Sequence, residues 1–330
     1  MRDNSIKSLL RIGDNDGPQK IGFLLLNQFS MIAFASAIEP LRAANQQANK
    51  VLFNWVVAST DGSSSQASNG IEIHTETNLE NLQKCRIVFV CAGVKVRENT
   101  SKSILNLIRR LDRNGTIIGA ICTGTYVMAA AGLLTSRRCT IHWEHITGLS
   151  EEFPDLEITN DLFEIDGNRI TCSGGTASLD MMLNLITQAH GASLAAEISD
   201  QLIHDRIREP SDRQRMELRA RLGVSHPKLL AVVKIMEDNL EEPLVQTDIA
   251  IKTNLSTRQL ERLFRKYLET TPTRYYLNLR LKRARHLLRQ TSLTILSVAL
   301  ACGFVSASHF SKCYREYYNR TPRTERSLEA

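Results

Sequence analysis

A cysteine stands in this sequence where a buried strand would turn into a helix. The apolar run Thr116–Ile121 leads into Cys122, and the segment Thr125–Gly132 follows with the small residues of a closely packed helix. A thiol at a helix N-terminus gains thiolate character from the helix dipole, so this order predicts a nucleophile elbow. His142 follows 20 residues after the cysteine and could serve as its base if the fold brings the two side chains together.

The same residues allow two other interpretations. Cysteine is among the most buried residue types, and His142 could satisfy a hydrogen bond in the core. The carboxyl edge of a parallel sheet also binds ligands whether or not it catalyses a reaction. The residues alone therefore leave open a cysteine-dependent hydrolase or deglycase, a ligand sensor and a purely structural dimerising domain.

Two segments near the end of the chain, 50 residues apart, carry the same apolar stripe at the helical spacing i, i+3, i+4 and i+7. Each follows a short helical segment and a turn, and the turns contain Asn254 and Gly303, residue types that tolerate a left-handed backbone. Ser256 and Ser306 then stand where an N-cap belongs. This order predicts two helix-turn-helix units, whose second helices enter the major groove of DNA. The stripes are Leu260, Leu263, Phe264 and Tyr267, and Phe310, Cys313, Tyr314 and Tyr317.

Polar side chains off these stripes are expected to face DNA, because Arg, Gln and Ser suit base edges and Lys suits phosphate or guanine. The expected contact residues are Ser256, Thr257, Arg258, Gln259 and Arg262 in the first unit and Ser306, Ser308, His309 and Lys312 in the second. A long basic helix, Thr273–Gln290, is expected to separate the units and to hold cationic side chains near phosphates. Those side chains are Arg274, Arg280, Lys282, Arg283, Arg285 and Arg289.

Charge is divided unevenly along the chain. The net charge is +6, yet residues 228–330 hold 18 Lys and Arg against 10 Asp and Glu, whereas the remainder holds 23 basic and 25 acidic residues. A basic region beside a near-neutral one favours nucleic acid as the partner of the basic part. A solvated basic surface and a helical bundle with two similar hairpins are simpler alternatives, but two matching units in a region of net charge +8 favour DNA binding.

The rest of the chain alternates continuous apolar runs with helical patterns, which predicts a flavodoxin-like, doubly wound parallel α/β sheet ahead of the all-α region. The expected strands are Ile21–Leu26, Phe53–Ser59, Arg86–Cys91, Thr116–Ile121, Thr140–Trp143 and Arg169–Cys172. The expected helices are Met31–Gln47, Ser101–Asp112, Ala177–Ala189 and Ser193–Ile207.

A charged stretch with a proline near each end, residues 206–227, is expected to be a linker. It would divide a disordered leader (1–19) and a sensing and dimerisation domain (20–205) from a DNA-binding domain (228–330). No apolar run approaches the roughly 20 residues of a membrane helix, and no cofactor or metal is expected. The seven cysteines are scattered without a CxxC pair or an export signal, so they are expected to be reduced thiols in a cytoplasmic protein.

Residues 227–322 resemble the DNA-binding domain of the AraC-type transcriptional regulators. The resemblance rests on Leu255–Phe264, Pro272, Arg280–Arg285 and Gly303–Pro322. It implies that both second helices occupy successive major-groove segments on one face of promoter DNA. Carried over by position, the base-facing residues would be Arg258, Arg262, Ser308 and Lys312.

Residues 20–190 resemble the class I glutamine-amidotransferase-like, PfpI-type superfamily through the elbow Ala120–Thr125 and through His142. Catalytic members commonly place an acidic residue near the thiol from the first strand–helix turn, whereas Phe29–Ala33 holds none. The resemblance therefore implies an amidotransferase-like sensor rather than an enzyme, with Cys122 and His142 as vestiges of a catalytic pair.

Further segments resemble the branch of these regulators that controls catabolism of glycine betaine, carnitine or arginine. They are Phe23–Leu26, Ser30–Ile32, Ala37–Arg42, His142–Glu144, Ser173–Thr176 and Leu179–Met182. This resemblance implies an activator whose partners are a small cationic effector with a carboxylate, promoter DNA, RNA polymerase and a second copy of the chain. Aromatic faces, acidic charges and backbone amides would recognise such an effector, and the candidates are Trp143 or Phe29, Glu144 or Glu39, and the amides after Gly124 or Gly175. The expected ligand-binding residues are Phe29, Ser30, Met31, Gly93, Cys122, Thr123, Gly124, His142, Trp143 and Glu144.

Overall fold

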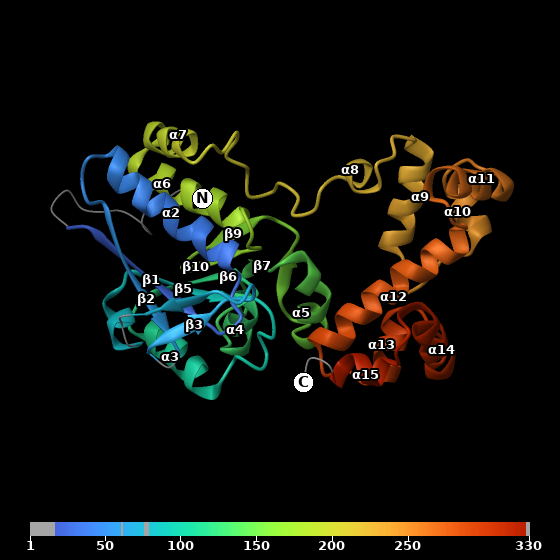
Figure 1. Cartoon of the computed structure of the whole chain (residues 1–330), viewed down its shortest axis with the longest axis horizontal. Coiled ribbons are helices and arrows are strands. Elements are labelled where there is room, and N and C mark those ends of the chain that lie inside the picture. The colour runs from blue at the N-terminus through green and yellow to red at the C-terminus, as the bar shows by residue number, and fades with distance from the viewer. Residues whose placement is uncertain (1–16, 61, 76–78, 328–330) are drawn as a thin grey trace. The chain divides into compact units, whose positions relative to one another are not determined.

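The structure is a computed structural model that describes residues 17–60, 62–75 and 79–327. The chain forms two compact units, which divide between Gln214 and Arg215 (Figure 1). Most of the expected leader, residues 1–16, lies outside the described residues, and its last residue, Gln19, already belongs to the first strand. None of the helices that the structure describes combines the length and the apolar character needed to cross a membrane.

The first unit is built on a six-stranded sheet in the order β2-β1-β5-β6-β10-β9. The strands are parallel except for β9, which runs antiparallel to β10 at one edge. Their bounds are β1 Gln19–Leu25, β2 Phe53–Ser59, β5 Ile87–Ala92, β6 Ile117–Cys122, β9 Phe163–Asp166 and β10 Arg169–Cys172. Strands β1, β5 and β6 are almost wholly buried because both faces of the sheet are covered, which confirms the predicted doubly wound sheet.

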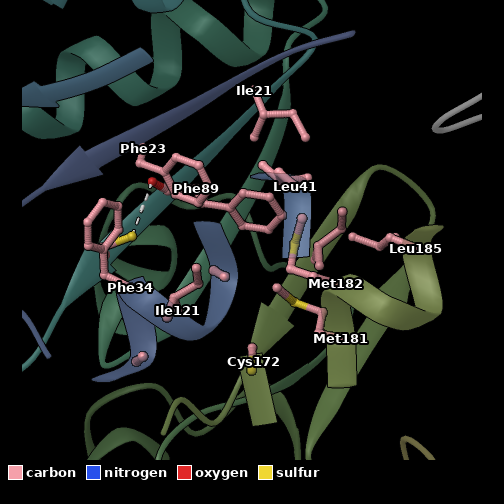
Figure 2. Close-up of a cluster of buried hydrophobic side chains, with 14 of the residues drawn as sticks. Ile21, Phe23, Phe34, Leu41, Phe89, Ile121, Cys172, Met181, Met182 and Leu185 are labelled. Atoms are coloured by element: carbon pink, nitrogen blue, oxygen red, sulfur yellow. Dashed lines mark hydrogen bonds between the residues drawn. The ribbon is translucent and has the colours of Figure 1, made fainter. Parts of the chain in front are cut away.

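Helices cover each face of this sheet and enclose a separate apolar core (Figure 1). One face carries α2 Met31–Gln47, α6 Ala177–His190 and α7 Ala192–Gln201, and the other carries α3 Lys102–Arg113, α4 Gly124–Ala130 and α5 Ile146–Glu152. On the first face the ring of Phe23 lies 5.5 Å from that of Phe34 and 5.8 Å from that of Phe89, measured between centroids. Figure 2 shows Met181 and Met182 of α6 completing this cluster.

Short strands and 3-10 helices flank the sheet, and in this part of the chain one predicted strand and one predicted helix need correction. They are β3 Ser64–Gln66, β4 Glu72–His74, β7 Arg138–Thr140, β8 Glu157–Thr159 and the 3-10 helices η1 Leu79–Lys84 and η2 Trp143–His145. The strand predicted at Thr140–Trp143 is wrong, because pairing with β8 ends at Thr140 and His145 N then bonds back to His142 O at 2.8 Å. The helix predicted at Ser193–Ile207 is too long and ends at Gln201.

The second unit is helical throughout the part that the structure describes, as the sequence predicts. Its helices are α8 Leu218–Leu222, α9 Pro227–Asp238, α10 Gln246–Lys252, α11 Thr257–Leu268, α12 Pro272–Gln290, α13 Ile295–Ala301, α14 Ala307–Tyr318 and α15 Pro322–Ser327. One small core packs α9, α10 and α11 against the start of α12, and another packs the rest of α12 against α13 and α14. Helix α12 therefore joins two similar halves (Figure 1).

The stretch 206–227, expected to be one linker, is structurally divided. Its residues up to Gln214 are hydrogen-bonded to the first unit. Helix α8 then forms within the stretch, and His226 Nδ1 caps α9 by accepting a hydrogen bond from Leu229 N at 3.4 Å. The free connection between the units is therefore shorter than the charged composition suggests.

Candidate DNA-binding and ligand sites

The second helix of each helix-turn-helix unit begins at a capped serine. Ser256 Oγ accepts a hydrogen bond from Gln259 N at 3.2 Å, and Ser306 Oγ accepts one from His309 N at 3.2 Å. The preceding turns contain left-handed residues, with φ of 51° at Asn254 and 72° at Gly303. The caps and turns inferred from residue types are therefore confirmed, and they set where α11 and α14 start.

The apolar stripes of α11 and α14 are one turn shorter than predicted. Leu260 and Phe264 are buried in α11, as are Phe310 and Tyr314 in α14. The last members of the predicted stripes, Tyr267 and Tyr317, are each 37% exposed. The fully buried residues of each helix therefore lie in its first two turns, and Leu268 and Tyr318 at the helix ends pack against the cores while staying partly exposed.

The nine residues expected to contact DNA are all exposed. Besides the capping serines Ser256 and Ser306, two more of them also serve the fold. Gln259 Oε1 accepts a hydrogen bond from Ser256 N at 2.8 Å and completes a capping box, so only its amide nitrogen lies outside the box. The ring of His309 packs 5.8 Å from that of Phe304, measured between centroids. Arg258, Arg262, Ser308 and Lys312 are exposed on α11 and α14, and their contact with DNA stays a prediction.

Cationic side chains hold both turns in place. Lys228 Nζ of α9 donates to Asn254 O at 2.8 Å. Arg280 of α12 donates from Nε to Cys302 O at 2.8 Å and from Nη2 to Gly303 O at 2.7 Å. These bonds satisfy carbonyl groups at the ends of α10 and α13, and they fix the second helices relative to the rest of the unit.

Four of the six cationic residues of α12 are engaged inside the unit, which corrects the expectation that they lie near phosphates. They are Arg280, Arg283, Arg285 and Arg289. Burial lowers the pKa of Arg280, whose guanidinium lies 4.1 Å from the centre of the Phe304 ring. The cations of α12 that stay exposed are Arg274 and Lys282, so these two remain the predicted phosphate contacts of this helix.

Glu325 of α15 is a fully buried carboxylate that ties the end of the unit to α12. Its Oε1 accepts from Arg285 Nε at 3.0 Å and from Arg289 Nε at 2.8 Å, and Arg320 Nε lies 3.8 Å from Oε2. Burial alone would raise the pKa of Glu325, but the bonds from Arg285 and Arg289 outweigh burial and hold that pKa below its usual value.

Glu325→Ala should destabilise the second unit by about 2–3 kcal/mol, below the usual range for a broken buried pair because the arginines are about a third exposed and regain water. Both tryptophans, Trp55 and Trp143, lie in the first unit, so tryptophan fluorescence reports that unit alone. In urea, circular dichroism should show an earlier transition while fluorescence does not. Because the carboxyl pKa is lowered on folding, its contribution is present above the unfolded pKa near 4.3 and is lost as pH falls through the folded value. Equal shifts in both signals would contradict this role.

The carboxyl edge of the sheet in the first unit is closed by backbone packing around Cys122. This residue has φ of 60°, the strained left-handed conformation expected of an elbow. A Cβ on Gly124 would lie 2.1 Å from a backbone oxygen of β5, and one on Gly93 would lie 2.3 Å from a backbone oxygen before α2. A Cβ on Gly174 would lie 2.6 Å from Cys122 Cβ. Close backbone approach therefore accounts for glycine at these three positions.

The thiol of Cys122 is poorly suited to nucleophilic attack. The residue is 8% exposed, and burial raises the pKa of its thiol to about 12. A backbone hydrogen bond at Thr123 lowers that pKa, but the charges of Cys172 and Glu144 raise it further. Burial therefore disfavours the thiolate that the sequence led us to expect. The Nδ1 of His142 lies 3.8 Å from Glu144 Oε2, and its ring lies 5.7 Å from that of Trp143, measured between centroids.

The ten residues expected around a ligand divide into a buried and a partly exposed set. Phe29 is fully buried with its ring edge-on to Phe34 at 5.8 Å, so the suggestion that it offers a face to a cation is wrong. Thr123 is also buried, and its Oγ1 donates to Gly93 O at 2.7 Å. The buried set is Phe29, Gly93, Cys122, Thr123 and Gly124. The partly exposed set is Ser30, Met31, His142, Trp143 and Glu144.

The other two candidates for effector contact, Glu39 and Gly175, differ in whether they are available to a ligand. Glu39 pairs with Arg42 on its own helix, with 2.7 Å between Oε2 and Nε, so its charge is already balanced. Gly175 has φ of 57°, and a Cβ there would meet nothing within 4 Å. The turn at Gly175 is therefore open, whereas the turn at Gly124 is closely packed.

Asp180 of α6 is a functional candidate that residue patterns did not reveal. It is fully buried, and its Oδ2 accepts from Arg208 Nε at 2.9 Å and from Nη2 at 2.6 Å. Its Oδ1 accepts from Arg208 N at 2.7 Å and lies 2.8 Å from His204 Nε2. Arg208 Nη2 also donates to Thr176 Oγ1 at 2.8 Å. The one available signal was an acid inside the apolar run Leu179–Met182.

Gln214 fastens the other end of the same stretch. Its Nε2 donates to Thr140 Oγ1 at 2.9 Å, to Ile141 O at 3.1 Å and to Asp161 O at 2.9 Å. We call residues 204–214 the anchored segment. Thr140 and Ile141 directly precede His142, and the Arg208 partner Thr176 directly follows the glycine turn against Cys122. The anchored segment therefore bonds to both stretches of chain that border the Cys122 edge.

Two family descriptions match this chain. The DJ-1/PfpI family matches residues 19–188, and a helix-turn-helix domain matches residues 249–327. The first range falls within the first compact unit and the second within the second unit.

Related proteins cover nearly the whole chain. It is 48% identical over 312 residues to the HTH-type transcriptional regulator GbdR of Pseudomonas aeruginosa, with 94% of this chain and 85% of that protein covered. It is 47% identical over 310 residues to the HTH-type transcriptional regulator CdhR of the same species, with 94% and 92% covered. A crystal structure of an AraC family transcriptional regulator from Pseudomonas putida matches 56% of this chain and 100% of that one, at 28% identity and a TM-score of 0.51.

The relatives are named as regulators and not as enzymes, in agreement with the raised pKa of the Cys122 thiol. Their similarity extends across both units, and the second unit carries two capped helix-turn-helix units. The chain belongs to the AraC family of DNA-binding transcriptional regulators, in the group that carries a DJ-1/PfpI domain ahead of its helix-turn-helix domain.

Proposed function

We propose that this regulator activates a catabolic operon when a small cationic amine or amino acid, such as glycine betaine, carnitine or arginine, binds in its first unit. The observation that carries the proposal is that Trp143 and Glu144 are neighbours in η2 and that each lies close to His142. Both are partly exposed, and the charge of Glu144 reaches Cys122 at the elbow. An aromatic face beside a carboxylate suits a cationic group.

The carboxylate of such an effector needs donors on the other side of the edge. The open turn at Gly175 supports this role, because a ligand can approach backbone there without displacing other atoms. Ser30, at the start of α2, has no side-chain cap bond and is half-buried at the same edge. In this proposal His142 and Met31 complete the contact surface, and the buried residues around Cys122 only support it.

Effector binding must favour one state of the protein over another if it is to regulate transcription. The anchored segment supports a route, because it bonds to both borders of the Cys122 edge and then leads into the second unit. An effector that moves either border would change how firmly residues 204–214 are held. The proposed partners are promoter DNA through α11 and α14, a second copy of the chain and RNA polymerase, and the proposed location is the cytoplasm.

Calorimetric titration of the full-length chain with glycine betaine, carnitine and arginine tests this proposal. At least one compound should bind, and Trp143→Ala should weaken its binding about tenfold or more, since a desolvated cation–π contact is worth about 2 kcal/mol. Trp55→Ala is the matched control, because Trp55 lies on β2 with its side chain 37% exposed. Three titrations without heat, by protein that still binds DNA, would reject this effector class.

A further inference from the structure

The turn of the second helix-turn-helix unit is one residue longer than that of the first. Leu255 N donates to Ala250 O at 2.9 Å, and Phe304 N donates to Ala299 O at 2.9 Å. Leu255 and Phe304 therefore occupy the same place in the two turns, and each packs into the core of its half of the unit. The next residue along the chain is different in the two turns.

Val305 is the extra residue. In the first unit the N-cap Ser256 comes directly after Leu255, whereas in the second unit Val305 stands between Phe304 and the N-cap Ser306. The Val305 side chain is 91% exposed, the highest value among the large hydrophobic side chains that the structure describes. The longer turn thus projects a branched apolar side chain away from the core, immediately ahead of α14.

The place of this side chain indicates its partner on DNA. Residues at the N-terminal end of a second helix reach base edges in the major groove, where the thymine 5-methyl group is the apolar feature. At this end of α14, Ser306 and Ser308 offer hydroxyls and the half-buried Ala307 offers one methyl group, so Val305 is the largest exposed apolar side chain there. We propose that Val305 packs against a thymine methyl group and so selects an A·T pair in the site that α14 reads. This inference rests on the proposed placement of α14 in the major groove.

The test uses the full-length chain and a duplex that the chain itself selects from a library with a randomised core. Each thymine of the selected duplex is then replaced by uracil, which lacks only the 5-methyl group. For the wild-type chain, one replacement should weaken binding about fourfold, the value of one buried methyl group. Val305→Ala should weaken binding to the thymine duplex by about that factor or more, and it should be indifferent to uracil at that position.

Two further variants sharpen the result. Val305→Thr keeps the branched shape but replaces one methyl group by a hydroxyl, so it should retain part of the preference for thymine. Val51→Ala removes an equally apolar side chain, 52% exposed, from the first unit and should leave every duplex affinity unchanged.

Three outcomes would overturn the inference, and each of them points to a different reason for its failure. Val305→Ala that binds like wild type shows that the side chain does not touch DNA. Equal weakening on thymine and uracil duplexes shows a contact with the DNA backbone rather than with a base. A library that yields no preferred duplex defeats the proposed DNA contacts of α11 and α14 as well, so it separates failure of that proposal from failure of the role of Val305.

Discussion

Alanine at Arg262 or Lys312 should weaken binding of the full-length chain to its promoter by about 1–3 kcal/mol for each base contact that the change removes, roughly 5- to 150-fold. Both side chains are exposed, one on α11 and one on α14, so neither change should disturb the cores beneath. Because the residues lie on separate helices with separate cores, the effects in the double variant should be close to additive. The measurement is a titration of labelled promoter duplex at fixed salt.

Each of these residues can contact either a base or a phosphate, and measurements of specific and non-specific binding distinguish the two roles. Removal of a base contact by Arg262 should affect recognition at one position only, so the variant should tolerate a changed base pair there while keeping its salt dependence. If Lys312 contacts a phosphate instead of a base, Lys312→Ala should weaken binding to all sequences alike and reduce the slope of log K against log salt by about 0.9. Arg110→Ala removes the same charge from an exposed position on α3 and should change neither measurement. Unchanged affinity in both variants would remove Arg262 and Lys312 from the residues that contact DNA.

The second unit was largely predictable because its signals are local. A cap serine, a left-handed turn residue and an apolar stripe lie within about ten residues of one another, and each acts on the nearest helix. The roles of the arginines on α12 were not predictable. Glu325 lies 40 residues from Arg285 in the chain, and whether a cation faces phosphate or a buried carboxylate is decided by packing between distant helices. The amino-acid composition gives the number of such charges but does not predict which group each of them contacts.

The first unit shows the same division between local and distant signals. Buried parallel strands were recognisable as continuous apolar runs, and β2 and β10 have the predicted bounds. The elbow at Cys122 was also foreseen, but its environment was not. The raised pKa of the thiol arises from burial and from Cys172 and Glu144, which other strands and turns supply. The anchorage of Arg208 by Asp180 joins residues 28 positions apart and left no pattern in either segment.

Arg208→Ala should release the anchored segment and abolish the effect of effector on DNA binding. The change removes three side-chain hydrogen bonds, two to the fully buried Asp180 carboxylate and one to Thr176. Removing one partner of a buried pair costs about 3–5 kcal/mol, and the bond from Arg208 N together with His204 keeps the loss toward the lower value. The first unit should therefore unfold at a lower urea concentration, which tryptophan fluorescence reports. Trypsin should cleave faster after Arg213, whose backbone pairs with Asp161 in the wild-type structure.

A neighbouring arginine supplies the matched control. Arg206 has a side chain that is 69% exposed and pairs with Asp212 at 2.8 Å, so Arg206→Ala removes the same charge two residues away and breaks only a surface ion pair. It should keep wild-type stability, cleavage after Arg213 and response to effector. Because Arg208→Ala lowers stability as well, Gln214→Ala is needed as a second variant. It removes the neutral hydrogen bonds that the two N–H groups of Gln214 Nε2 share among Thr140 Oγ1, Ile141 O and Asp161 O, and it leaves Asp180 paired.

The three variants together separate a coupling role from a purely structural one. If the anchored segment transmits the effector signal, Arg208→Ala and Gln214→Ala should each bind promoter with the same affinity in the presence and absence of effector, while still binding the effector itself. If the segment only stabilises the first unit, both variants should be less stable yet should respond to effector like wild type. The second pattern would contradict coupling through residues 204–214. It would require that the signal leave the first unit by another surface, since ligand can shift an equilibrium only through contacts that differ between the two states.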